Sequence, residues 1–83
     1  MKTLSKDNYN DYKEMKKYER FIWSDAGFCF FAFKINDDFA IFVNASGKFI
    51  IAKAYANMLS IGSDMVVEYN TFDEAEDHLD GDD

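Results

Sequence analysis

The sequence has no proline, a single cysteine and only four glycines among its 83 residues. One cysteine excludes an internal disulfide, and its aromatic neighbours Phe28, Phe30 and Phe31 predict that Cys29 is a buried thiol in a strand. The glycines are the clearest signals of turns between secondary-structure elements, because glycine takes backbone conformations that other residues avoid. No two of them fall within one loop, so the glycine-rich phosphate-binding motifs are absent.

Long uncharged apolar runs are also missing. No run approaches the roughly 18 residues that a membrane span requires. The first residues, MKTLSKDNYND, contain no apolar segment of the kind found in a secretory signal. The sequence therefore predicts a cytoplasmic protein with no membrane partner.

Basic side chains are missing from the C-terminal segment. From Asp64 to Asp83 there are nine acidic residues and no Lys or Arg, whereas residues 1–22 hold six bases against four acids. Residues 23–63 hold three of each, so the formal net charge of −7 is set by the C-terminal segment. A field of this sign attracts basic partners and repels phosphates, which predicts no direct binding of nucleic acid.

Aromatic side chains are abundant, with nine Phe, five Tyr and one Trp. A domain of this size buries only about 60–65% of the surface that its unfolded chain exposes, so large side chains are needed to build a core. Aromatic rings are also enriched at protein interfaces, so some of them are candidates for a contact surface. We expect one domain over residues 1–83, with residues 80–83 as an acidic tail.

Turn signals divide the middle of the chain into strands. Gly27 closes a predicted hairpin loop that begins at Ser24, and two further turns are expected at 36–38 and 44–47. The predicted strands cover residues 21–23, 28–35, 39–43, 48–52 and 64–70. Residues 52–60 are ambiguous between strand and helix. There we expect strand first and then a short helical turn that ends near Gly62.

The strand over residues 28–35 is apolar on both faces, which places it in the middle of the sheet. One face of the sheet should be covered by a helix, and the other by loops, a second helix or a partner molecule. We expect Phe31 and Phe33 to pack under the helix. Truncating Phe31 to Ala would then cost about 3–5 kcal/mol.

Both ends of the chain predict helices. Ser5 or Asp7 can cap a helix over residues 8–17. Near the other end, Thr71 and Glu74 have the spacing of a capping box. The expected fold is therefore α+β: an antiparallel sheet of four or five strands with an N-terminal helix and a short acidic C-terminal helix.

The C-terminal helix is predicted to be amphipathic. Phe72, Ala75 and Leu79 recur at i, i+3 and i+7 and form an apolar stripe, with acidic side chains on the opposite face. Neighbouring carboxylates there are about 4.5–6 Å apart along the axis, a spacing similar to that of successive phosphates. The candidate partner-binding residues are Asp64, Glu68, Asp73, Glu76, Asp77, Asp80, Asp82 and Asp83.

The helix dipole explains only part of this charge. Acidic residues in the first turn are favourable, but those near the C-terminal end cost some tenths of a kcal/mol each. A solubilising tail tolerates such a cost. The alternative is that the acidic side chains form a surface that binds a basic site of a partner.

Metal and catalytic sites lack their residues in the sequence. The acidic stretch over residues 77–83 has neither the spacing nor the closing glutamate of an EF-hand loop. His78 is the only histidine and has no cysteine near it in the sequence. No nucleophile stands beside a base held by a third group. We therefore expect no cofactor, no metal and no enzymatic activity.

Two functions remain open. The first is a small acidic binding protein that inhibits a nucleic-acid-handling protein by presenting carboxylates where phosphates would bind. In size and charge it is similar to the phage and mobile-element proteins that disarm restriction or CRISPR systems, and to nuclease inhibitors; its partner would be a basic protein surface. The alternative is a structural or accessory subunit that binds a protein partner through an aromatic sheet face. No motif indicates a family.

Overall fold

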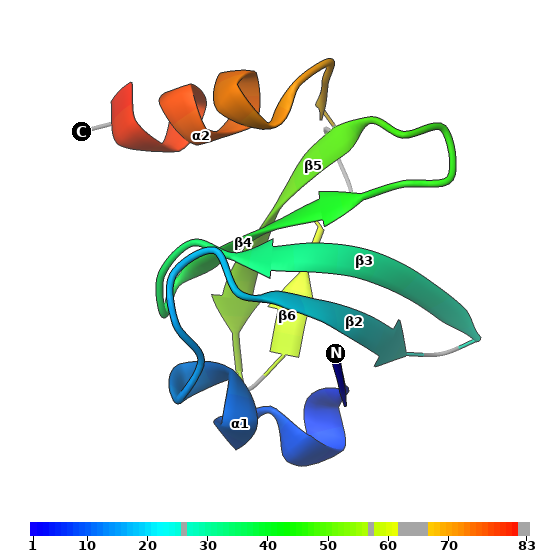
Figure 1. The fold of residues 1–83 in the computed structure, drawn as a ribbon. Helices are drawn as coiled ribbons and strands as arrows, with labels where there is room; N and C mark the ends of the chain where they lie inside the picture. Colours follow the sequence, from blue (N-terminus) through cyan, green and yellow to red (C-terminus); the bar gives the residue numbers. More distant parts are fainter. Residues whose placement is uncertain (26, 57, 62–66, 82–83) are drawn as a thin grey trace.

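A mixed β-sheet forms most of the structure (Figure 1), which is a computed structural model describing residues 1–25, 27–56, 58–61 and 67–81. The strands are β1 (Lys2–Leu4), β2 (Arg20–Asp25), β3 (Phe28–Lys34), β4 (Phe39–Val43), β5 (Phe49–Tyr55), β6 (Met58–Ser60) and β7 (Glu68–Tyr69). The helical elements are the 3-10 turn η1 (Lys6–Asn8) and the α-helices α1 (Asn10–Lys13) and α2 (Phe72–Gly81).

The sheet is larger than the predicted four or five antiparallel strands. Its order is β1-β2-β3-β4-β5-β6, and β7 pairs with β5 as well. Strands β2 to β5 are antiparallel as predicted, with β3 in the middle, but β1 pairs with β2 in parallel. A parallel pair needs a crossover connection, which here contains η1 and α1. The sequence gives little sign of β1, because Leu4 is its one buried residue.

The turns predicted at 36–38 and 44–47 are confirmed, whereas the loop predicted to begin at Ser24 begins later, because β2 continues to Asp25, which pairs with Phe28. Gly27 and Gly47 have φ of +89° and +80°, a region that favours glycine. In the turn between β3 and β4, the side-chain oxygen of Asn36 accepts hydrogen bonds from the backbone N–H of Asp38 (2.8 Å) and of Phe39 (2.9 Å). The side-chain oxygen of Asn44 accepts in the same way after β4. These local signals set the register of the meander.

The helical turn predicted before Gly62 is wrong where the structure describes it. β5 continues to Tyr55, and β6 folds back on it so that Leu59 lies opposite Ala54 and is buried in the core. Burial of Leu59 in a hairpin outweighs the helix propensity of the segment. Of the strand predicted over residues 64–70, β7 is present at Glu68–Tyr69, and residues 62–66 lie outside the described residues.

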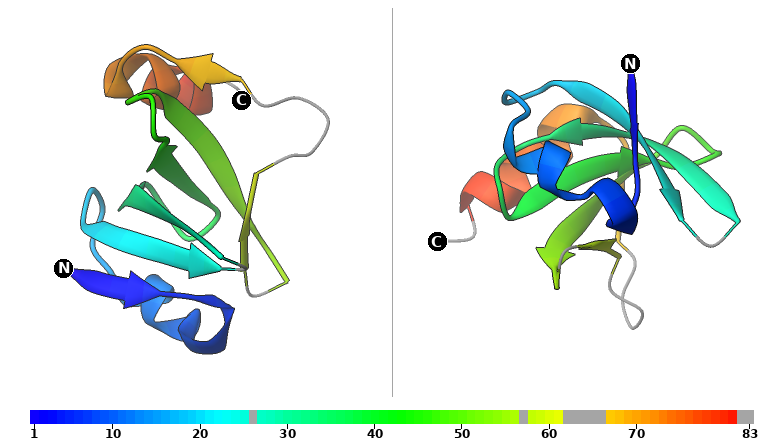
Figure 2. Two further views of the ribbon diagram at one scale, coloured as in Figure 1. Left: turned by 90° about the vertical axis from the view of Figure 1, so that its right-hand side faces the viewer. Right: turned by 90° about the horizontal axis from the view of Figure 1, so that it is seen from below.

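The two faces of the sheet hold separate hydrophobic clusters. On the side that we call the core face, Phe21, Trp23 and Phe42 are buried against the N-terminal segment. On the side that we call the helix face, Ile41 packs with Ala75 of α2. Figure 2 shows α1 and α2 at opposite ends of the molecule.

The predicted helix over residues 8–17 is shortened to η1 and a single turn, α1. Ser5 caps η1, because its hydroxyl accepts a hydrogen bond from the backbone N–H of Asp7 at 3.3 Å. Tyr12 and Met15 are buried on the core face, which keeps the segment close to the sheet. In the described part of the chain, no helix is long and apolar enough to cross a membrane.

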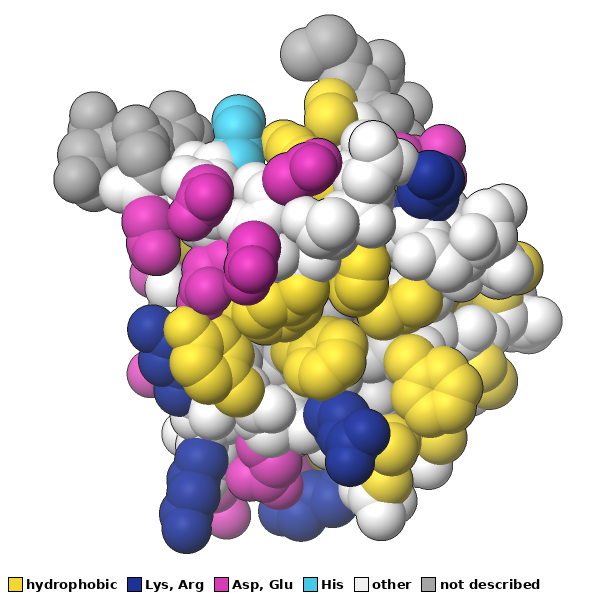
Figure 3. All heavy atoms as spheres, turned by 45° about the horizontal axis from the view of Figure 1, so that its top comes forward, with side chains coloured by type: hydrophobic (Ala, Val, Ile, Leu, Met, Phe, Trp, Pro, Cys, Tyr) yellow, Lys and Arg dark blue, Asp and Glu magenta, His cyan; other side chains and the backbone are white. Residues whose placement is uncertain are grey.

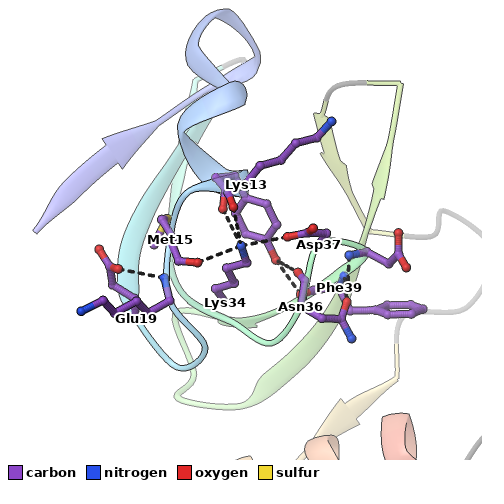
Figure 4. Close-up of polar contacts among 10 residues, drawn as sticks. Lys13, Met15, Glu19, Lys34, Asn36, Asp37 and Phe39 are labelled. Carbon is purple, nitrogen blue, oxygen red and sulfur yellow. Dashed lines mark hydrogen bonds and ion pairs between the residues drawn. The ribbon is translucent and has the colours of Figure 1, made fainter.

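A buried lysine ends α1. The ammonium of Lys34, on β3, donates to the carbonyls of Tyr12 (2.8 Å), Lys13 (3.2 Å) and Met15 (2.9 Å), as Figure 4 shows. Lys34 is only 4% exposed and pairs with Asp37 at 3.0 Å. A longer helix would use these carbonyls for its own hydrogen bonds. The ammonium satisfies them from outside the helix.

Candidate protein-binding surface

The N-terminus of α2 is fixed by a modified capping box. The hydroxyl of Thr71 accepts from the N–H of Glu74 at 3.1 Å, as predicted. The carboxylate of Glu74 accepts from the N–H of Asn70 at 3.4 Å, whereas in a standard capping box it would accept from the N–H of the cap residue, here Thr71. The helix start is therefore held from both directions.

The predicted apolar stripe of α2 packs on the helix face. Ala75 is completely buried, and Leu79 and Phe72 pack against the same cluster. The ring of Phe72 meets those of Phe33 (5.1 Å) and Phe49 (6.2 Å) edge to face. These contacts fix the rotation of α2 about its axis, so its other face is directed to solvent.

Four of the predicted partner-binding residues share that outer face. Asp73, Glu76, Asp77 and Asp80 lie at i, i+3, i+4 and i+7, and we call them the acidic row. Glu76 is half-buried and the other three are exposed. The row extends over about 10 Å of helix. Asp80 and Gly81 belong to α2 and not to a tail.

Lys17 lies near the acidic row, with its ammonium 5.0 Å from the centre of the Tyr18 ring, but the row forms no ion pair within the described ranges. There, the only ion pair is the one between Lys34 and Asp37, on the α1 side of the molecule. Asp77 and Asp80 also lie toward the negative end of the helix dipole, which does not stabilise them. This surface therefore presents negative charge that no ion pair neutralises within the described residues.

The other predicted site residues are only partly placed. Glu68 lies on β7, next to α2, and its carboxylate accepts a hydrogen bond from the side-chain amide of Asn44. Asp64, Asp82 and Asp83 lie outside the described residues.

Tyr18 joins the acidic row to the sheet, and the sequence analysis missed it. Its hydroxyl donates to the carboxylate of Glu76, and its ring meets Phe72 edge to face at 5.8 Å. The hydrogen bond to Glu76 is the main cause that raises the pKa of Tyr18, with burial second. The φ angle of Tyr18 is +69°, a conformation that is unfavourable for residues with bulky side chains. The sequence signal for the contact between Tyr18 and Glu76 is weak: it is only that Tyr18 lies shortly before an apolar strand.

Part of the helix face is not covered by α2, which corrects the prediction for Phe31. Ile22, Phe31 and Val43 are paired neighbours on β2, β3 and β4, and we call them the open strip. Phe31 is 56% exposed, and Ile22 and Val43 are half-buried. α2 has ten residues, so it is about 15 Å long, and its backbone lies mainly against β4, β5 and β7. Phe33, in contrast, does meet the helix through Phe72.

The open strip ends beside an exposed thiol. Cys29 was predicted to be buried, but it pairs with Ser24 at the end of the β2–β3 hairpin and is exposed. Its sulfur lies 3.6 Å from the hydroxyl of Ser24. β3 is apolar on both faces, but near Cys29 only the core face is covered. Apolar neighbours in the sequence therefore do not make Cys29 buried.

Acidic and hydrophobic side chains meet on one side of the molecule. Figure 3 shows a group of acidic side chains over the α2 end, with hydrophobic side chains gathered directly beside it. Tyr18, Phe72 and Phe33 connect the acidic row with the sheet through ring contacts. Negative charge therefore lies directly beside exposed apolar surface on this side of the molecule.

Comparisons and metal chemistry assign no role to this surface. Among the residues that the structure describes, no three His, Cys, Asp or Glu side chains are grouped to hold a metal ion. The chain matches no protein-family model, and comparison with curated proteins and with solved structures gives no significant match.

Proposed function

We propose that this protein is a non-catalytic binding protein that docks on a basic surface of a nucleic-acid-handling protein and inhibits it by occupying its phosphate sites. The observation that carries the proposal is the acidic row, which a tightly packed helix holds outward and which forms no ion pair in the described part of the chain. Restriction, CRISPR and toxin nucleases have basic surfaces of this kind. An anti-defence protein of a phage or mobile element, or a nuclease inhibitor, would therefore act in this way.

The geometry favours binding for two physical reasons. Carboxylates that are already in place lose little freedom when Lys and Arg side chains of a partner bind them with charge-assisted hydrogen bonds. Electrostatic attraction alone yields fast but salt-sensitive association. The open strip adds apolar area beside the charge, which supports a long-lived complex.

Charge reversal tests the acidic row. The α2 variant changes Asp73, Glu76, Asp77 and Asp80 to Lys. The α1-side variant changes Asp7, Asp11, Glu14 and Asp38 to Lys; these exposed acids lie away from α2 and make the same change in net charge. Host proteins captured by the wild-type protein should be lost with the α2 variant and kept with the α1-side variant. Capture should also weaken as salt rises.

Competition tests the mimicry itself. A captured partner should bind either this protein or its nucleic acid, because both use the same phosphate sites. A stable ternary complex at saturating concentrations of both would contradict phosphate mimicry. Capture that is unchanged by the α2 variant would contradict the acidic row as the contact surface.

A second candidate function rests on the open strip. Phe31 exposes 56% of its surface in the middle of the sheet, which suits an accessory subunit that binds its partner through apolar contacts. A variant with Phe31→Ser and Val43→Thr should then lose the partner. The α2 variant should keep it, and rising salt should leave the affinity nearly unchanged.

A further inference from the structure

A pocket opens on the core face, separate from the acidic row and the open strip. It lies between the β2–β3 hairpin and β6 and has a volume of about 230 Å³. Aromatic rings and a thioether form much of its wall: Trp23, Phe28, Phe30, Phe42 and Met58. This volume suits a single chemical group and not a large ligand.

The aromatic wall is fixed by packing. Trp23 and Phe42 are 1% exposed and form the floor, whereas Phe28 is 49% exposed and forms the mouth. Phe30 links them, because it stacks on Phe42 at 5.3 Å and meets Phe28 edge to face at 5.4 Å. The rings therefore hold their places without a ligand.

Among the described residues that line this pocket, Asp25 is the one that carries a charge. It lies directly opposite Phe28 in the β2–β3 pairing and is half-buried. Within the described residues, its carboxylate makes no hydrogen bond and no ion pair. A carboxylate at the edge of an aromatic pocket attracts a cation, so a cation in the pocket would interact with both Asp25 and the rings.

The remaining chemistry selects the kind of cation. Aromatic rings attract a cation placed over their faces, most strongly where water is excluded. A plain ammonium has three donors to satisfy, but the described part of the pocket wall offers only two side-chain oxygen groups as acceptors, the carboxylate of Asp25 and the hydroxyl of Ser60. An alkylated ammonium has fewer donors, and its alkyl groups match the apolar wall. We propose that this pocket binds an alkylated ammonium group, as in choline or a methylated lysine side chain.

The protein carries its own probe for this test. Trp23 is the only tryptophan and lies in the pocket wall, so its fluorescence should change on binding. The probe ligand is choline, compared with its uncharged carbon isostere, in which a tert-butyl group replaces the trimethylammonium. Choline should bind about tenfold more tightly than the isostere, because the isostere lacks the attraction to the rings and to Asp25. Equal affinity would overturn the proposal.

Two variants locate the site. Asp25→Asn should weaken choline binding by about tenfold and leave the affinity for the isostere unchanged. Asp11→Asn, at an exposed acid of α1, is the control and should bind choline as the wild type does. Unchanged choline binding in Asp25→Asn would overturn the proposal. If Asp25→Asn does not fold, Phe28→Leu serves instead, since Phe28 is half exposed and its ring should be needed for binding.

Peptides distinguish the two sources of the ligand. A short peptide with trimethyllysine that binds more tightly than choline indicates a methylated protein, and the reverse order indicates a free small molecule. The unmethylated peptide should bind weakly in both cases, and binding as tight as that of the methylated one would contradict the proposal. The α2 variant should bind choline normally, so this inference stands or falls separately from the proposed function.

Discussion

Phe31 and Phe42 occupy neighbouring strands but opposite faces of the sheet. Phe42 is 1% exposed and Phe31 is 56% exposed. Phe42→Ala should lower the free energy of unfolding by about 3–5 kcal/mol because it empties the core. Phe31→Ala should lower it by less than about 1 kcal/mol.

Thermal unfolding checks this pair, since 1 kcal/mol shifts the midpoint by about 4–8 °C in a domain of this size. An equal loss in both variants would mean that Phe31 is covered in the folded protein.

The sequence could not separate these two residues. Alternation divides a strand into two faces, but β3 is apolar on both of them. How far α2 extends over the helix face depends on where β7 and α2 pack, which no local pattern encodes. Lys34 is a similar case, because the carbonyls that make its burial favourable come from a segment about twenty residues away in the chain.

At the scale of single elements, the hairpin turns before and after β5 each place a residue at positive φ, and only one of these residues is a glycine. Ala56, between β5 and β6, has φ of +50°, and Gly47, between β4 and β5, has φ of +80°. Ala56→Gly should raise the free energy of unfolding by about 0.5–1 kcal/mol, because glycine relieves the strain. Gly47→Ala should lower it by about 1–2 kcal/mol.

Sterics do not complicate the Gly47 variant, because a Cβ atom there would meet nothing within 4 Å. Urea unfolding measures both changes. Changes of the same sign would show that the φ angles do not govern the two turns.

The acidic row should make α2 less stable than it could be. Asp77→Lys with Asp80→Lys places cations at the negative end of the dipole, which should raise the free energy of unfolding by about 0.5–1 kcal/mol. The same double variant should bind the partner more weakly, if the row is the contact surface. Asp73→Lys is the control, because an acid in the first turn is favourable and its loss should lower the thermal midpoint. A double variant that is less stable than the wild type would contradict this account.

Long elements were predictable and short ones were not. α2 has ten residues, a capping residue before its first turn and an apolar stripe along one face, and all three features can be recognised in its sequence. β1 and β6 have three residues each, with Leu4 and Leu59 as their one buried residue. A single buried residue has no periodicity, so only the tertiary fold defines these strands. The acidic row was therefore predictable, whereas the open strip and the pocket were not.

For the molecule as a whole, the buried tyrosines predict loss of stability in alkali. Burial is the main cause that raises the pKa of Tyr12, and it raises that of Tyr9 as well. Both phenols thus keep their protons in the folded state above about pH 10, where the unfolded chain releases them. Below about pH 10 the two phenols contribute fully to the free energy of unfolding. Above about pH 10 each phenol lowers the free energy of unfolding by up to about 1.4 kcal/mol per pH unit.

Thermal midpoints between pH 8 and 11 test this expectation. The hydroxyl of Tyr12 lies 2.8 Å from the carbonyl oxygen of Asn36 and 2.6 Å from that of Phe39. Tyr12→Phe should therefore be less stable at neutral pH, by about 1 kcal/mol, but its alkaline slope should be shallower. An identical slope in the variant and the wild type would exclude Tyr12 as the cause.

The burial of Lys34 also gives the protein one amine whose acylation reports on the opening of its core. A reagent that acylates amines reaches exposed lysines such as Lys53 directly, but it reaches Lys34 only when β3 separates from α1. For a domain stable by about 5 kcal/mol, that state is populated about once in several thousand molecules. Acylation of Lys34 should be slower than that of Lys53 by the same factor, and mild denaturant should reduce the difference. Mass spectrometry of the two acylated sites then measures the opening equilibrium in the protein with its natural sequence.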